Sequence, residues 1–283
     1  MAVFTNQATL TYNGNVINSN IATGEIIEVL SATKTAVTDI YGQNDTVTYV
    51  INIVNSGSLP FSGLSVTDDL GAYTFNTGEV VPLEYVAGSV KYYINGILQP
   101  QPSVSAGPPL VINGINVPAG GNATVIYAAD TNGYAPLAEG GTIVNSALID
   151  GGGITEITVS ETITAENEAS LTITKSISPS TVTENGEVTY TFVIENTGNT
   201  PVAATDNAVI TDVFDPVLSS LAAAFNGTAW TEGTNYTYDG TTGIFTTASG
   251  QITVPAATFT QDASTGIWIV TPGVSTLAVT GTI

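Results

Sequence analysis

A long internal repeat constrains this chain more than any other feature of its sequence. A lysine-bearing segment, an alternating strand pattern and a Val/Ile-Thr-Asp triplet occur in the same order over residues 32–68 and 173–212. The paired lysines, Lys34 and Lys175, stand 141 positions apart, so one period is about 140 residues and the 283-residue chain holds two. We therefore expect two equivalent domains, each large enough for its own core.

The phase of the repeat predicts that the two ends of the chain belong together. Asn145 has an earlier counterpart in Asn6, 139 positions before it, so the order along the chain is Asn, Lys, Asn, Lys. From Lys34 to Asn145 is 111 positions, and the same step from Lys175 reaches position 286, beyond the given sequence. We expect a second domain that lacks the strand carrying its asparagine.

Both termini read as parts of that strand. The Gly-Thr-Ile triplet at 281–283 matches the triplet at 141–143, which runs on into the strand of Asn145. At the N-terminus, Phe4, Ala8 and Leu10 alternate as core-facing residues of a strand do. These residues are predicted to complete the second domain of a neighbouring subunit. The simpler alternatives are an N-terminal strand that folds back on its own chain, or a sequence that is a fragment.

The composition predicts an all-β fold. The chain is 43% hydrophobic, is rich in Thr, Val, Ile and Tyr, and is divided into short alternating runs by 29 glycines and 13 prolines. Asn-Gly pairs suit tight turns with positive φ, and they occur at 13–14, 95–96, 113–114, 185–186 and 226–227. We predict two tandem immunoglobulin-like sandwiches, with a donor strand or hairpin at 1–25, a complete domain at 26–167 and an incomplete domain at 168–283.

Charge and missing residue types exclude several functions. With 3 basic residues against 24 acidic ones, the chain offers no cationic surface for nucleic acid, and no apolar run predicts membrane insertion. The absence of His and Cys removes the usual bases and nucleophiles, so we predict no enzyme, no cofactor and no metal. Asp68-Asp69 and the group Asp206, Asp212 and Asp215 could attract Ca²⁺, but their spacing matches no regular loop, and a solvated acidic surface is the simpler interpretation.

Three motifs resemble the Ig-like conserved repeat domains of bacterial surface proteins. They are Lys-x-x-x-Pro at 175–179, Gly-Glu-Val-Thr-Tyr-Thr-Phe-Val-Ile-Glu-Asn-Thr-Gly at 186–198, and Val-Ile-Thr-Asp at 209–212. The resemblance is good over about 170–215 and fair over 30–70, where the first copy lacks the proline. Such domains are similar to pilin and adhesin modules with intramolecular Lys–Asn isopeptide bonds, which this resemblance implies here.

The repeated residues fit that chemistry. Lys34 and Asn145 lie among apolar neighbours on strands that can be adjacent in a sandwich, and Asp68 follows a Val-Thr pair on a middle strand. Burial favours a neutral amine and a protonated acid, so the amine can attack the carboxamide and expel ammonia. We predict an intramolecular Lys34–Asn145 bond assisted by Asp68. The alternatives are an ordinary buried Lys–Asp ion pair with the asparagine as a hydrogen-bond partner, or surface lysines.

The second copy predicts a bond between subunits. Lys175 and Asp212 have no asparagine ahead of them in the given chain, and Asn6 of another subunit can fill that place. Glu195 is a competing acid, but Val54 replaces it in the first copy.

These expectations give a function. We predict a structural subunit of an extracellular bacterial pilus-like fibre or spore appendage, a homopolymer of identical subunits joined head to tail by donor-strand exchange. The spore surface is considered because no secretory signal is visible at the start of the sequence. The alternative is a monomeric adhesin or surface-layer binding module. An enzyme is the third possibility and is disfavoured by the lack of His, Cys and Arg. The only catalysis that we predict is single-turnover, autocatalytic isopeptide formation.

Overall fold

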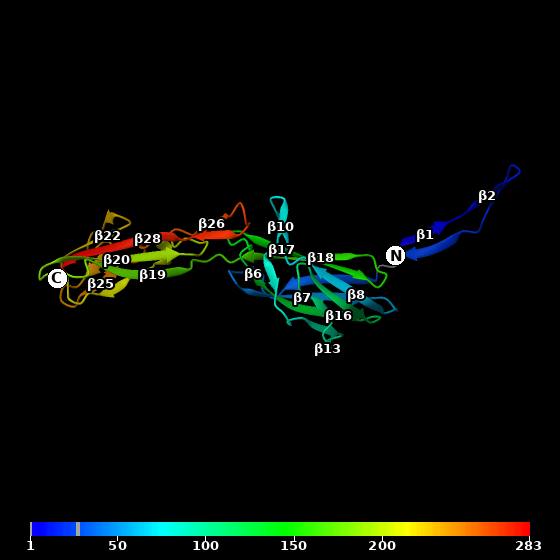
Figure 1. Ribbon diagram of the computed structural model, residues 1–283, viewed down its shortest axis with the longest axis horizontal. Coiled ribbons are helices and arrows are strands. Elements are labelled where there is room, and N and C mark those ends of the chain that lie inside the picture. The colour runs from blue at the N-terminus through cyan, green and yellow to red at the C-terminus, as the bar shows by residue number, and fades with distance from the viewer. Residues whose placement is uncertain (1, 27–28) are drawn as a thin grey trace. The chain divides into compact units, whose positions relative to one another are not determined.

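The computed structural model describes residues 2–26 and 29–283, and the chain divides into two compact units (Figure 1). Unit 1 holds the described residues of Met1–Asp39, Asn44–Thr131 and Val144–Ile163, and unit 2 holds Ile40–Gln43, Asn132–Ile143 and Thr164–Ile283. Apart from a 3-10 turn at Ala204–Asp206, every regular element described is a β-strand. The predicted all-β fold is therefore confirmed. Within the described ranges, no helix has the length and apolar character needed to span a bilayer.

The Ig-like sandwich around Lys34 is built from two six-stranded sheets. The first follows the order β13 (Ile97–Leu98), β12 (Lys91–Ile94), β16 (Asn122–Thr131), β7 (Thr46–Asn55), β5 (Leu30–Ala36), with β11 (Leu83–Tyr85) also paired to β16. The second follows β14 (Ser103–Ser105), β15 (Leu110–Val117), β8 (Phe61–Asp68), β17 (Thr142–Gly151), β18 (Ile157–Ala165), β6 (Ile40–Tyr41). A small hairpin joins β9 (Tyr73–Phe75) to β10 (Gly78–Val80).

Strict alternation explains the core between these sheets. Side chains of a strand point to opposite faces in turn, so every second residue of β7 and β16 is buried. The buried set from the facing strands is almost wholly aliphatic and aromatic, including Ile51, Ile53, Leu64, Val66, Leu110, Ile112 and Val125. Lys34, Asp68 and Asn145 occupy positions of the same inward phase and are buried with them. The fold thus places three polar side chains in an apolar interior.

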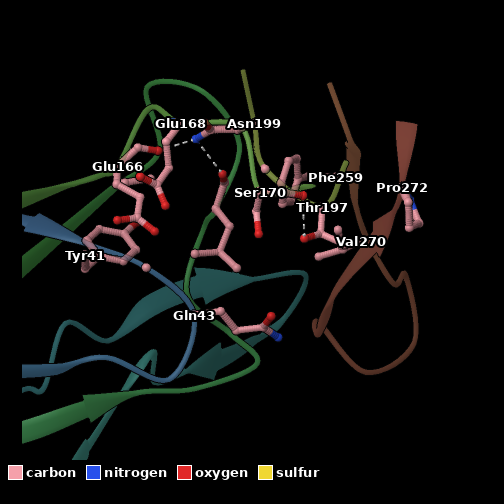
Figure 2. A pocket seen from close by; sticks show the side chains of 14 residues that line it. Tyr41, Gln43, Glu166, Glu168, Ser170, Thr197, Asn199, Phe259, Val270 and Pro272 are labelled. Carbon is pink, nitrogen blue, oxygen red and sulfur yellow. Dashed lines mark hydrogen bonds between the residues drawn. The ribbon is translucent and has the colours of Figure 1, made fainter. Parts of the chain in front are cut away.

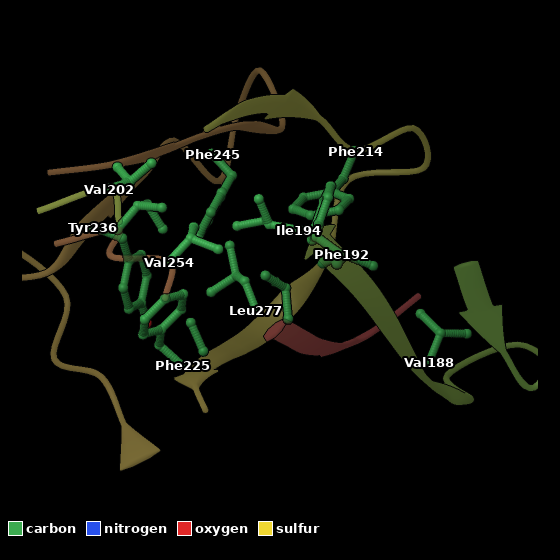
Figure 3. Packing of buried hydrophobic residues seen from close by; sticks show 14 residues of the cluster. Val188, Phe192, Ile194, Val202, Phe214, Phe225, Tyr236, Phe245, Val254 and Leu277 are labelled. Atoms are coloured by element: carbon green, nitrogen blue, oxygen red, sulfur yellow. The ribbon is translucent and has the colours of Figure 1, made fainter. Parts of the chain in front are cut away.

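Unit 2 repeats this plan with fewer strands. One sheet follows β19 (Leu171–Ser178), β20 (Glu187–Asn196), β28 (Gly273–Thr282), β22 (Ser219–Phe225), β23 (Thr228–Ala229). The other follows β21 (Thr211–Val213), β25 (Ile244–Thr247), β24 (Tyr236–Tyr238), and a hairpin joins β26 (Thr258–Gln261) to β27 (Trp268–Thr271). Their core contains Phe192, Phe214, Phe245 and Leu277 (Figure 3).

Strand register shows which parts of the two units correspond. Tyr49 of β7 lies opposite Tyr127 of β16, and Tyr190 of β20 lies opposite Val279 of β28. Because β20 repeats β7, β28 is the counterpart of β16. The expected match between 281–283 and 141–143 is therefore wrong. The likeness is limited to three residues, whereas the place of β28 is fixed by ten paired positions along β20. Among the described residues of unit 2, nothing takes the places of β17 and β18.

The N-terminal residues form a hairpin of their own. β1 (Ala2–Asn6) pairs with β4 (Ala22–Ile26), and β2 (Thr9–Tyr12) pairs with β3 (Asn15–Asn18). The turn at Asn13-Gly14 has positive φ at both residues, 49° and 77°, which this pair adopts at low cost. Within the described chain these four strands pair only with one another. We call residues 2–26 the N-terminal hairpin.

Candidate cross-linking site

Lys34 lies in the sandwich core, where the inward phase of β5 places it. Its Nζ is 2.7 Å from Oδ2 of Asp68 on β8, and both side chains are fully buried, with exposed fractions of 0%. The Tyr49 ring centre is 5.0 Å from Nζ, so an aromatic face adds a favourable contact for a cation. Lys34 and Asp68 therefore bridge the two sheets.

Burial shifts both partners of this pair toward their neutral forms. It lowers the pKa of Lys34, and the attraction of Asp68 offsets only part of that change. It also raises the pKa of Asp68, although Lys34 and Tyr127 both hydrogen-bond to the carboxylate. An uncharged amine is a nucleophile and a protonated carboxyl is an acid, so the environment prepares both groups for amide chemistry.

Asn145 reaches the pair through a tyrosine. Its Nδ2 donates to Oη of Tyr127 at 3.0 Å, and that hydroxyl donates to Oδ2 of Asp68 at 2.6 Å. The Asn145 side chain is buried, and its Oδ1 has no hydrogen-bond partner among the described residues. Leaving a buried carbonyl oxygen without a partner costs about 1–3 kcal/mol, so this oxygen is available to a further group at the site.

Tyr127 is a functional candidate that the sequence does not reveal. It lies within an apolar alternating run on β16, where tyrosine is an ordinary core residue. Only its contacts with Asp68 and Asn145 distinguish it. The sequence offers only a general indication, namely that the hydroxyl of a buried tyrosine needs a hydrogen-bond partner.

Unit 2 contains the same type of pair in an open setting. Lys175 Nζ contacts Oδ2 of Asp212, and their side chains are 38% and 19% exposed. Three rings surround the amine, with centres 4.7, 5.4 and 5.2 Å from Nζ, and they belong to Tyr190, Phe192 and Phe214. Every residue of β19 is exposed, in contrast to the buried lysine position on β5. The lysine and the aspartate of the first site therefore recur here, but they are partly exposed to solvent.

An unpaired strand edge lies beside this second pair. In unit 1, β8 is bonded on both sides, to β15 and to β17, and Ala147 of β17 lies opposite Asp68. In unit 2, the equivalent strand β21 pairs with β25 only, within the part of the chain that the structure describes. The free edge of β21 therefore stands where an asparagine-bearing strand lies in unit 1.

The remaining predicted residues lie in the N-terminal hairpin. Asn6 is opposite Ala22, and Phe4 is opposite Gly24, where a Cβ would lie 2.3 Å from the phenyl ring. Phe4 and Leu10 are 56% and 63% exposed, and Ala8 is exposed too. The structure thus brings Lys34, Asp68 and Asn145 into one network and presents the predicted donor residues to solvent.

A cavity of about 360 Å³ in unit 2 does not add a second site (Figure 2). Asn199 lies in its wall and donates Nδ2 to the carbonyl oxygens of Leu137 and Glu166, at 3.1 and 2.6 Å. No cluster of three metal-binding side chains occurs among the residues described. The Asn199 amide is thus engaged in hydrogen bonds within unit 2.

Comparison with known proteins gives neither a family nor a function. No protein-family model matches the chain, and no curated protein matches it. The Streptococcus pneumoniae pilus backbone RrgB is 11% identical with a TM-score of 0.36, over 86% of this chain and 55% of that one. BcpA, the major pilin subunit of Bacillus cereus, is 10% identical with a TM-score of 0.36, over 95% and 73%. A collagen-binding domain from a Staphylococcus aureus adhesin is 13% identical with a TM-score of 0.30, over 48% and 97%.

Proposed function

We propose that this chain is the structural subunit of an extracellular fibre on a bacterial cell or spore, polymerised by donor-strand exchange between identical copies. The carrying observation is a contrast between two equivalent lysine–aspartate pairs. One is sealed in a sandwich with an asparagine, and the other lies beside the free edge of β21. The N-terminal hairpin has the sequence pattern of β17 and β18, the two strands that cover the Lys34–Asp68 pair.

The match between the two hairpins extends beyond the asparagines. On β17 the inward residues Ile143, Asn145, Ala147 and Ile149 are all buried. With the 139-position offset, their counterparts are Phe4, Asn6, Ala8 and Leu10. A second strand then follows beside each segment: β18 lies next to β17, and β3 and β4 pair with β2 and β1. The donor in this proposal is accordingly a two-stranded hairpin.

The known register of β17 fixes the register expected for the donor. Ala147 lies opposite Asp68, so Ala8 of the incoming hairpin should lie opposite Asp212 of the acceptor. Asn6 then takes the position of Asn145, within reach of Lys175. Insertion completes the ladder of β21 and buries Phe4 and Leu10, each gaining about 1.5–3 kcal/mol when fully covered.

Covalent sealing follows from the same burial. In unit 1, the Lys34 amine attacks Cγ of Asn145, the new amide forms, and Nδ2 leaves as ammonia. Donor entry gives Lys175 the cover that Lys34 already has, so the Lys175–Asn6 bond forms between subunits. The result is a fibre strengthened without disulfides, in keeping with a chain that has no cysteine. In both reactions the protein acts once and is not an enzyme.

Denaturing electrophoresis and intact mass test this proposal with two matched variants. The wild type is expected to form filaments that give ladders after boiling in detergent, with one ammonia lost inside each subunit. Asn6→Ala should still assemble but lose the ladders, because the donor strand remains while its reactive amide is gone. Asn145→Ala should keep the ladders and lose only the internal bond. A wild type that stays monomeric with its full mass would refute the proposal and favour a monomeric binding module.

A further inference from the structure

The Tyr127 hydroxyl lies directly between the acid and the leaving nitrogen of the unit 1 site. Oη is 3.0 Å from Nδ2 of Asn145 and 2.6 Å from Oδ2 of Asp68. The ring is fully buried on β16 and stacks on Tyr49, with 5.4 Å between ring centres. Packing therefore fixes the hydroxyl in place, so its position between the two groups is part of the fold.

The reaction needs a proton at this nitrogen. An amide nitrogen leaves as ammonia only after it gains a proton, and a positioned acid accelerates such transfers. Asp68 is the acid of the site, but the hydrogen bond from Nδ2 goes to Tyr127 and not to that carboxyl. We infer that Tyr127 is a catalytic proton relay, carrying the proton of Asp68 to the departing nitrogen. This inference rests on the proposed amide bond.

Proton transfer through Tyr127 would leave both Asp68 and Tyr127 unchanged at the end of the reaction. Neutral Lys34 Nζ bonds to Cγ of Asn145. Before the reaction, Nδ2 donates to Tyr127 and Tyr127 donates to Asp68, so both hydrogen bonds reverse once Nδ2 becomes an amine-like nitrogen with a free lone pair. As the Cγ–Nδ2 bond breaks, Tyr127 gives its hydroxyl proton to Nδ2 and receives the carboxyl proton of Asp68. The Asp68 carboxylate then takes the surplus proton from Nζ. Ammonia leaves, an amide remains, and both Asp68 and Tyr127 return to their starting protonation.

Burial also explains why the tyrosine passes a proton without holding a charge. It raises the pKa of Tyr127 well above its usual value, and the nearby Asp68 carboxylate raises it further. A free phenolate is therefore strongly disfavoured at this position. Giving one proton while receiving another avoids that state, and the short contact to Asp68 provides the return path.

Unit 2 has no hydroxyl at this position. Val279 of β28 lies opposite Tyr190, as Tyr127 lies opposite Tyr49, and Val279 is fully buried. The bond inside unit 1 therefore has a proton relay that the bond between subunits lacks. Unit 1 should seal as it folds, and the joints between subunits should seal later, after assembly.

Tyr127→Phe in the full chain tests the relay. Samples from timed cell-free synthesis are quenched in denaturant, and intact mass reports the loss of ammonia. Loss of a positioned acid should slow the internal bond by about 10²–10⁴-fold. Ladder formation in preassembled filaments should keep its wild-type rate, because unit 2 does not use Tyr127. This second rate is an internal control for folding.

Each other result has a distinct meaning. An internal bond that forms at the wild-type rate in Tyr127→Phe overturns the relay while leaving the proposed fibre intact. Slowing of both bonds also overturns it, since that indicates a general effect on the fold. Absence of ammonia loss in the wild type refutes the proposed bond itself. As a further check, a fluorinated tyrosine at position 127 alone should shift the pH profile of the rate, because it alters acidity with little change of shape.

Discussion

Lys34 and Lys175 have similar direct partners but differ in burial. Both amines contact an aspartate and the face of at least one aromatic ring. Only Lys34 is enclosed, with a side chain that is 0% exposed against 38% for Lys175. Desolvation lowers the pKa of the Lys34 amine. A buried ion pair adds little to stability over apolar packing. The small net gain from such a pair is the reason why we propose a reactive role for Lys34 and Asp68.

Asp68→Ala tests this interpretation at the residue scale. Without the acid, no ammonia should be lost, and Lys34 is left buried without its ionic partner. Removing one member of a buried pair costs about 3–5 kcal/mol, so the variant should unfold at lower urea concentration than Asn145→Ala, which is also unbonded but keeps the pair. Intact mass and urea titration measure the two effects. A bonded Asp68→Ala protein would show that the acid is not needed.

At the level of elements, the N-terminal hairpin and the edge of β21 both expose surfaces that promote aggregation. Exposed apolar side chains such as Phe4, Leu10 and Ile17 favour association, and an open strand edge templates pairing. In the proposed fibre the two features would pair in register, because the hairpin repeats the sequence pattern of β17. Pairing would then cover both the apolar side chains and the open edge.

Leu10→Asp tests the donor at this scale. Leu10 corresponds to the buried Ile149, so a charge there should block insertion and abolish filaments while unit 1 keeps its melting temperature and its internal bond. Thr5→Asp is the matched control on the same segment, since its counterpart Val144 is half exposed. Electron microscopy reports filaments, and intact mass reports the bond. Filaments from Leu10→Asp would contradict the proposed register.

Features that depend on neighbouring residues in the sequence could be predicted, and features that depend on distant strands could not. The alternation of β7 is local, and so are the turns at 13–14, 95–96 and 226–227, where both residues of each Asn-Gly pair have positive φ. The pattern at 113–114 also predicts a turn, but this pair lies inside β15, at a point where the register of pairing with β8 shifts. Tyr127 and the identity of β28 could not be predicted, because each depends on which strand lies opposite in the sheet.

For the whole molecule, the proposed contact is directional. In this proposal the N-terminal hairpin of one subunit meets the β21 edge of the next, and such a heterologous contact builds a filament when its rotation does not close into a ring. The net charge of −21 keeps free subunits apart in dilute salt, so growth depends on this specific fit more than on general attraction. A filament of this kind has two different ends.

That polarity can be tested with a subunit from which residues 2–26 are deleted. It keeps the β21 edge and can accept a donor, but it offers none, so each copy that joins should stop growth at that end. The mean filament length should fall in inverse proportion to the truncated fraction in a mixture. A Lys175→Ala subunit mixed in at the same fraction is the matched control. It can both accept and donate a strand, so the filament length should stay constant, while the ladders seen after boiling should become shorter. If the truncated subunit leaves filament length unchanged, the two ends are not distinct and the head-to-tail arrangement is wrong.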